Sequence, residues 1–297
     1  MSATAATTGA PRNSAGRSAS ALMHRHVWLR LTALIAAPMF WLGVAYLGSL
    51  AALFITAFWS TNDFTGDVVR VWTTENYQQL WNDDVYRTII LRSITVAAGV
   101  TILDAVIAFP IAFYMAKLAR PSIQKLLVVA ILMPLWASYL VKGYAWRTMF
   151  SENGLLDSTF IGTPGFGLFA TVVTLSYLWL PYMILPVFAG LQRLPDSLLD
   201  ASGDLGARPG RTFRSVIVPI IFPALVAGSI FTFSLSLGDY ITVEIVGGPK
   251  QLLGNVVYDN IGAANNLPFA AAMATVSVVI MLIYLSAVRR TGALDNL

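Results

Sequence analysis

Residues 200–219 read DASGDLGARPGRTFRSVIVP and form a polar, basic stretch between two long apolar segments. Apolar residues recur at helical spacing in its first half and just before it. These residues are Leu194, Leu198, Leu199, Ala201 and Leu205. Gly206 is suited to end such a helix in a left-handed cap, Pro209 and Gly210 then turn the chain, and Pro219 opens the next apolar segment. The stretch therefore predicts a short helix at a membrane surface that presents a patterned face to a soluble partner.

The composition predicts a polytopic membrane protein. Hydrophobic residues make up 57% of the 297-residue chain and charged residues only 11%, and the mean hydropathy is +0.69. A soluble domain is about a quarter charged. The absence of cysteine excludes disulfides, thiolate metal sites and cysteine nucleophiles. The pI near 9.4 does not indicate nucleic-acid binding, because the basic residues lie in short loops rather than on one patch.

Six apolar stretches are long enough to cross a bilayer, which needs about 20 residues each. They are residues 34–59, 89–116, 126–150, 168–192, 216–237 and 268–288. Lysine and arginine gather before the first stretch and after the second, fourth and sixth, whereas the alternate loops are acidic. The positive-inside rule then places both termini and residues 200–219 in the cytoplasm. The expected fold class is an all-α membrane protein with six transmembrane helices, N-in and C-in.

This pattern divides the chain into three parts. Residues 1–30 are basic, contain no acid and are expected to form a disordered cytoplasmic tail, although organelle transit peptides have the same composition. Residues 31–88 contain the first transmembrane helix and an extracytoplasmic loop. Residues 89–290 form the core, with a cytoplasmic loop at residues 193–215.

The stretch at residues 200–219 resembles the EAA loop of bacterial ABC importer permeases. An acid precedes two small residues, a glycine follows four positions later, and an apolar-x-apolar-proline motif ends the pattern. Asp200 stands where glutamate is usual in that family, and Ser202 where the second alanine is usual. In the family this loop docks a short coupling helix into a cleft of the cytoplasmic ATPase subunit. The resemblance therefore implies an ATPase-coupling role for Asp200, Ala201, Ser202, Asp204, Gly206, Arg208 and Pro219.

Further motifs are similar to those of spermidine/putrescine-type permeases. They lie at residues 134–147, 153–156, 237–240, 246–249 and 254–255. With the loop, they extend the resemblance from about residue 77 to the C-terminus. The resemblance implies a type I ABC importer permease bundle in the bacterial cytoplasmic (inner) membrane, most simply for polyamines. The implied partners are a second permease of similar fold, an ATPase dimer that binds ATP and Mg²⁺, and an extracytoplasmic solute-binding protein.

The residues argue against an enzyme. No G-x-x-x-x-G-K-[ST] motif occurs, so the chain is not itself the ATPase. The only histidines, His24 and His26, lie in the tail, which leaves no serine–histidine dyad or H-E-x-x-H motif within the apolar stretches. We therefore expect no catalytic residue, metal site or cofactor in this chain, and no nucleic-acid partner.

Polar residues in the apolar stretches are candidates for the solute path. Ser229, Thr232, Ser236 and Asp239 follow one another at steps of three, four and three, which places them on one helical face. Because polar groups facing lipid are costly, this face is expected to meet protein or a water-filled path. The hydroxyls fit helix–helix contacts equally well. Asp239 at the outer end, with Glu244 beyond it, suits a cationic solute.

Three more candidates lie on other stretches. Asp104 is deep in the second stretch, where an acid is a functional candidate, although neighbouring hydroxyls or a lysine would also satisfy it. Trp179 and Tyr139 suit an aromatic box for ammonium groups. Interfacial belts of Trp and Tyr are the ordinary alternative.

Two other functions fit parts of the sequence. An ABC permease for a ferric ion, an anion or a zwitterion would carry the same loop. A stand-alone secondary transporter or channel would show inverted repeats or helices broken near the midplane, and the hydropathy indicates neither.

Overall fold

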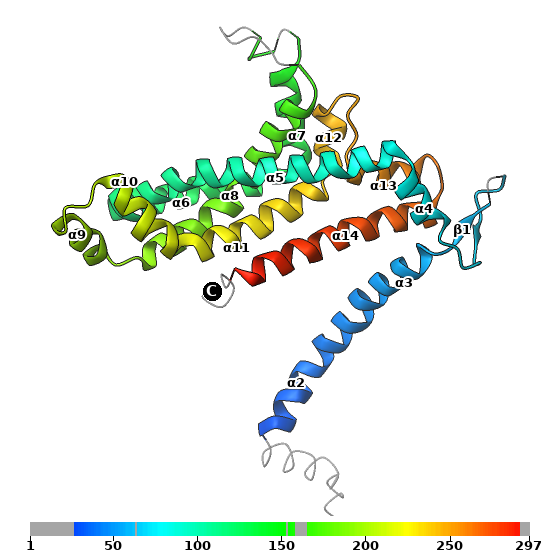
Figure 1. Cartoon of the computed structure of the whole chain (residues 1–297), viewed down its shortest axis with the longest axis horizontal. Helices are drawn as coiled ribbons and strands as arrows, with labels where there is room; N and C mark the ends of the chain where they lie inside the picture. Colours follow the sequence, from blue (N-terminus) through cyan, green and yellow to red (C-terminus); the bar gives the residue numbers. More distant parts are fainter. Residues whose placement is uncertain (1–26, 63, 153, 158–164, 292–297) are drawn as a thin grey trace, which may run out of the picture. The chain divides into compact units, whose positions relative to one another are not determined.

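The computed structural model describes residues 27–62, 64–152, 154–157 and 165–291, so residues 1–26 of the expected tail lie outside it. Secondary structure in the described part is helical apart from one two-stranded sheet (Figure 1), which confirms the all-α fold class. The chain forms two compact units, Met1–Ile55 and Thr56–Leu297. Each is described by itself.

The described residues of the first unit, from Val27 on, form one long apolar helix. It runs through α2 (Val27–Trp41), the π-helical η1 (Leu42–Leu47) and α3 (Gly48–Thr56). Residues Leu34–Thr56 can cross a membrane, which matches the first expected span except that the helix ends three residues early. Neither η1 nor α3 has a buried residue. A helix that is apolar on all sides needs lipid or protein around it.

The second unit begins with a short hairpin and a helix. β1 (Ser60–Thr61) pairs antiparallel with β2 (Val68–Val69), and α4 (Glu75–Asn82) follows. The Asp83 side chain accepts a hydrogen bond of 2.8 Å from the Val85 N–H and so caps α5 (Asp84–Phe113). With the π-helical η2 (Tyr114–Leu118), α5 makes a span of 35 residues, longer at both ends than expected.

The third expected span, residues 126–150, is not one helix. The structure has α6 (Pro121–Trp136) and α7 (Tyr139–Phe150), bent by 93° at a break. Pro134 lacks an N–H three residues before the break, Ala137 is extended, and Ser138 has φ of −55° and ψ of 136°. The apolar pattern does not change across the break, so the expectation of unbroken helices was wrong here.

The fourth expected span is confirmed as α8 (Leu168–Arg193), which leads into the short helix α9 (Asp196–Asp204). The fifth is longer than expected. α10 (Pro209–Thr212), η3 (Phe213–Ile217) and α11 (Val218–Leu237) form one span of 29 residues. It begins at Pro209, whose fixed φ suits the first helical position, so the prediction that Pro209 turns the chain was wrong. Pro219 lies inside this helix, in the first turn of α11 and two residues after the π-helical turn.

The segment after α11 contains two short helices where an acidic loop was expected. They are α12 (Ile241–Val246) and α13 (Leu253–Gly262). The last expected span follows as α14 (Leu267–Arg290), which the Asn266 side chain caps at the Phe269 N–H. We call the end of this unit that contains α9 and α10 the α9 end, and the region that contains α7, α12 and α13 the α12 end (Figure 1).

The centre of the second unit is the packing of α5, α8 and α11. Two glycines bring α8 and α11 close together. A Cβ added at Gly190 would lie 2.6 Å from the Ala224 Cβ, and one at Gly228 would lie 2.6 Å from the Met183 Sδ. Small residues at such crossings let membrane helices pack closely.

Candidate functional site

The turn after α9 is built by local hydrogen bonds. Gly206 has φ of +72°, which confirms the left-handed cap expected there. Its N–H donates to the Gly203 carbonyl at 2.8 Å, and the Ala207 N–H donates to the Ser202 carbonyl at 3.0 Å. These two bonds form a Schellman motif that closes the helix.

The two faces of α9 differ. Asp200, Ala201 and Asp204 are exposed, and the side chain of Leu205 is 88% exposed. Ser202 faces the other way: it is buried, and its Oγ lies 2.7 Å from the Thr212 Oγ1. The outer face is therefore free to meet a partner, and the polar substitution at Ser202 does not lie on it.

Arg208 and Pro219, the other residues predicted to couple to the ATPase, lie in different parts of the structure. Arg208 is exposed and is the N-cap of α10. Pro219 lies ten residues further along the same helix than Pro209, about 15 Å away. Pro219 therefore belongs to the span rather than to the loop.

One residue at the α9 end has no counterpart among the sequence predictions. The Lys117 Nζ in η2 donates to the Leu194 carbonyl and to the Asp196 Oδ1, each at 2.6 Å. The Lys117 side chain is 9% exposed. No spacing rule relates Lys117 to residues 77 and 79 positions away.

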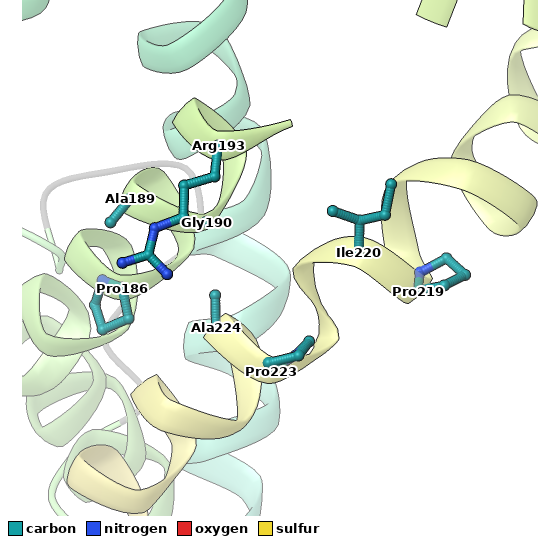
Figure 2. A pocket seen from close by; sticks show the side chains of 8 residues that line it. All are labelled: Pro186, Ala189, Gly190, Arg193, Pro219, Ile220, Pro223 and Ala224. Carbon is teal, nitrogen blue, oxygen red and sulfur yellow. The ribbon is translucent and has the colours of Figure 1, made fainter. Parts of the chain in front are cut away.

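A groove of about 410 Å³ lies between α8 and α11 at the same end. It is lined by Pro186, Ala189, Gly190, Arg193, Pro219, Ile220, Pro223 and Ala224 (Figure 2). Figure 2 shows the Arg193 side chain turned back toward Pro186 and Ala224. Arg193 carries the only charge among these lining residues.

The hydroxyl face of α11 meets neighbouring helices, as one of its two interpretations predicted. The Ser229 Oγ lies 2.6 Å from the Tyr284 Oη of α14. The Thr232 Oγ1 is 3.4 Å from the Thr101 Oγ1 of α5. Ser236 is buried, and its Oγ has no hydrogen-bond partner among the described residues. Ser229 and Thr232 therefore join helices.

Asp104 is fully buried between α5 and α8. The Ser176 hydroxyl donates to its Oδ1, which fits the expectation of a neighbouring hydroxyl. Its Oδ2 has no partner among the described residues, and the same holds for the Trp179 Nε1 and the Thr174 Oγ1. Asp104 is thus an internal polar group of the bundle in this structure.

Asp239 is buried as well, beyond the end of the α11 span. It accepts hydrogen bonds from the Tyr139 hydroxyl and, at 2.8 Å, from the Thr242 N–H. Burial raises the pKa of the Asp239 carboxyl above its usual value, and the bonds from Tyr139 and Thr242 lower it in part. Asp239 therefore holds α7 and α12 together, whereas Glu244, the other acid expected outside, is exposed.

The two aromatic candidates lie together, as part of a longer row. Tyr139 stacks on Trp179 with ring centroids 5.9 Å apart and an interplanar angle of 28°. Trp179 lies 5.9 Å from Tyr182, and Tyr182 lies 6.3 Å from Phe231. Phe231 is 52% exposed. This aromatic row, Tyr139–Trp179–Tyr182–Phe231, runs from α7 across α8 to α11.

The motifs at the α12 end connect helices to one another. Gly254 faces the Asp239 carbonyl, which an added Cβ would approach to 2.9 Å. The Asn255 Nδ2 donates to the Tyr240 carbonyl at 3.1 Å. The Arg147 Nη1 donates to the Ile245 carbonyl at 2.8 Å. These contacts join α7, α12 and α13 to the end of α11.

Comparisons with known proteins agree with the fold and give the family of this chain. Residues 25–293 match the model of the family "Binding-protein-dependent transport system inner membrane component". The chain is 42% identical over 291 residues to the inner membrane ABC transporter permease protein YdcU of Escherichia coli, covering 91% of this chain and 92% of that protein. It is 30% identical over 245 residues to the spermidine/putrescine transport system permease protein PotB of Escherichia coli, covering 80% and 88%.

Two solved structures share the fold. A chain of a bacterial ABC transporter that imports the acidic polysaccharide alginate aligns with a TM-score of 0.70 at 14% identity, covering 92% of this chain and 99% of that chain. A chain of the MetNI methionine ABC transporter aligns with a TM-score of 0.52 at 18% identity, covering 70% and 97%. With the exposed α9 loop and the helical bundle, the sequence match shows that this chain belongs to the binding-protein-dependent transport system inner membrane components, the permease subunits of ABC importers.

Proposed function

We propose that this subunit forms one wall of the solute path of an ATP-driven importer for polyamines such as spermidine and putrescine. The aromatic row carries the proposal. Its four rings lie about 6 Å apart and become exposed toward Phe231. Polyamines alternate ammonium groups with short methylene segments, and both bind well against aromatic faces. The 30% identity to PotB supports the same solute class.

The acids have different parts in this proposal. Asp239 holds the first ring, because its carboxylate accepts the Tyr139 hydroxyl bond. Glu244 is exposed at the same end and is the acid that meets the arriving cation. Asp104, Ser229, Thr232 and Ser236 support the wall from inside the bundle.

The proposed complex contains this permease, a second permease of similar fold, two ATPase subunits and an extracytoplasmic solute-binding protein. The ATPase subunits bind ATP and Mg²⁺, and the exposed face of α9 docks on them. Both termini and α9 lie on the cytoplasmic side of a bacterial inner membrane. ATP-driven movement of α9 then switches the spans between inward-open and outward-open states.

The orientation has a direct test. The chain has no native cysteine, so Arg208→Cys and Glu244→Cys each introduce a single thiol. A membrane-impermeant maleimide applied to intact cells should label the Glu244→Cys variant and spare the Arg208→Cys variant. Labelling of position 208 from outside would contradict the orientation.

Uptake tests the solute class. The reconstituted complex is assayed with radiolabelled putrescine and spermidine, and in parallel with ferric ion, molybdate and a neutral amino acid. We expect Trp179→Ala to slow polyamine uptake about tenfold, because each ring contact with an ammonium is worth about 0.5–2 kcal/mol. Trp179→Phe should keep most of the activity. Trp81→Ala removes an exposed tryptophan of α4 and serves as the control.

Two results would contradict the polyamine proposal. One is import of another solute from the panel in place of polyamines. The other is wild-type polyamine uptake by Trp179→Ala, which would remove the aromatic row from the path.

A further inference from the structure

We propose that Lys117 is a positioning residue that fixes α9 to the inner end of α5, so that α5 passes the movement of α9 to α13. The proposal rests on the proposed role of α9 as the ATPase contact. It assigns a transmitting role to α5, a helix that contains no part of the EAA pattern.

The contacts of Lys117 join three elements. Its ammonium donates to the carbonyl of Leu194, directly after α8, and to the carboxylate of Asp196, in the first turn of α9. Only Leu194 and Pro195 separate these helices. One ammonium therefore bonds both the linker and the first residue of α9, and the ring of Pro195 limits the φ of that residue.

The electrostatics favour a tight attachment. Lys117 lies against the C-terminus of α8, where the helix dipole favours a cation. Charge-assisted hydrogen bonds such as the one to Asp196 are about twice as strong as neutral ones. The Lys117 side chain is 9% exposed, so its bond to the Leu194 carbonyl is shielded from water, whereas the Asp196 side chain is 78% exposed and its bond contributes less. A neutral side chain at position 117 would free the start of α9.

The first half of α5 is attached to α13 in a similar way. The Leu253 N–H of α13 donates to the Ser93 Oγ at 2.8 Å, and the Arg92 Nη1 donates to the Gln251 carbonyl at 3.1 Å. Lys117 and Ser93 are 24 residues apart on one continuous helical span, about 35 Å. A displacement of α9 that moves Lys117 therefore moves the α5 span, to which α13 is bonded through Ser93.

Two variants and a control test the attachment. Lys117→Met removes the charge at similar length, and Lys117→Arg keeps the charge and the donors. Lys125→Met removes an exposed lysine of the neighbouring α6 and is the matched control. Hydrogen exchange of the α9 amides in nanodiscs, without the ATPase, reports the attachment itself. We expect Lys117→Met to speed this exchange about tenfold, and Lys117→Arg and Lys125→Met to change it little.

A second measurement tests transmission. In the complete complex we measure ATP hydrolysis and import of radiolabelled putrescine with its binding protein. Lys117→Met should keep basal ATP hydrolysis but raise the ATP hydrolysed per putrescine imported at least about fivefold, whereas Lys117→Arg restores the wild-type ratio. A merely structural role would lower hydrolysis and import together.

The outcomes separate this inference from the proposed function. Unchanged α9 exchange in Lys117→Met overturns the attachment, whether or not the complex imports polyamines. Faster exchange with a wild-type ratio of ATP to putrescine overturns transmission through α5. If the wild-type complex imports another solute, the polyamine proposal fails, and that solute replaces putrescine in the same assay.

Discussion

The motifs at the two ends of the bundle differ in exposure and in the range of their hydrogen bonds. At the α9 end, Asp200, Ala201 and Asp204 are exposed, and the bonds that close the turn join residues a few positions apart. At the α12 end, the bonded groups Asp239 and Asn255 are buried. The Asp239–Tyr139 and Arg147–Ile245 bonds join residues about 100 positions apart in the chain.

This difference separates two kinds of evidence. An exposed motif built by local bonds indicates a surface for a partner, because its side chains are not needed by the fold. A motif whose groups are hydrogen-bonded inside the protein indicates a structural role in joining helices, because each buried acceptor already has its donors. The proposed solute contacts therefore lie on the aromatic row, whose first ring Asp239 holds, rather than on the bonded groups of Asp239 and Arg147.

The largest expected effect is that of Gly206→Pro. Proline fixes φ near −65°, whereas Gly206 has φ of +72°, and the substitution also removes the N–H that bonds to the Gly203 carbonyl. We expect loss of solute-stimulated ATP hydrolysis and of import, with insertion of the permease unchanged. Both activities are measured in proteoliposomes.

Gly203→Ala is the matched control for this change. Gly203 lies inside α9, and an added Cβ meets no atom within 4 Å. Wild-type import by Gly206→Pro would show that the α9 turn has no part in coupling, and the contrast between the two ends would fail.

Asp239→Ala should affect stability more than specificity. It leaves the Thr242 N–H without its acceptor, at a cost of about 1–3 kcal/mol, and leaves the Tyr139 hydroxyl with the Thr242 Oγ1 as its remaining partner. We expect a lower thermal unfolding temperature in nanodiscs, which Asp239→Asn should largely restore. Glu244→Ala, at an exposed position, should shift stability by no more than about 0.5 kcal/mol. A stable Asp239→Ala variant that fails to import would instead place Asp239 on the solute path.

Long apolar segments and local caps could be predicted from the sequence. The helices α8 and α14 begin and end within two residues of expectation because apolar length decides a span. The Gly206 cap was predictable because its chemistry involves neighbouring residues only. The break at Ala137 and Ser138 was not, since no polar or charged run marks it.

The candidate site was predictable only where one helix carries it. The outer face of α9 follows from helical spacing, and the sequence predicts Tyr139 and Trp179 as aromatic candidates for one solute. The contacts of Lys117 and Asp239 depend on how distant helices pack, which spacing along the chain does not encode. Burial of Asp104 and Asp239 likewise follows from tertiary packing.

The smallest expected effect, that of Ser202→Ala, distinguishes the two faces of α9. Ser202 occupies a position where alanine is usual in this loop, and its hydroxyl lies 2.7 Å from the Thr212 Oγ1 on the buried side. Its removal should cost about 0.5–1.5 kcal/mol of stability, the ordinary worth of one hydrogen bond.

The binding of the ATPase subunit should not change in Ser202→Ala, because the exposed face keeps Asp200, Ala201 and Asp204. Thr212→Val removes the other partner and should give a similar loss of stability, with little further loss in the double variant. Stability is followed by thermal unfolding, and ATPase binding by titration of the labelled subunit onto nanodiscs. If Ser202→Ala alters ATPase binding more than about threefold while Thr212→Val does not, the Ser202 side chain takes part in docking, because the bond to Thr212 could not account for such a difference.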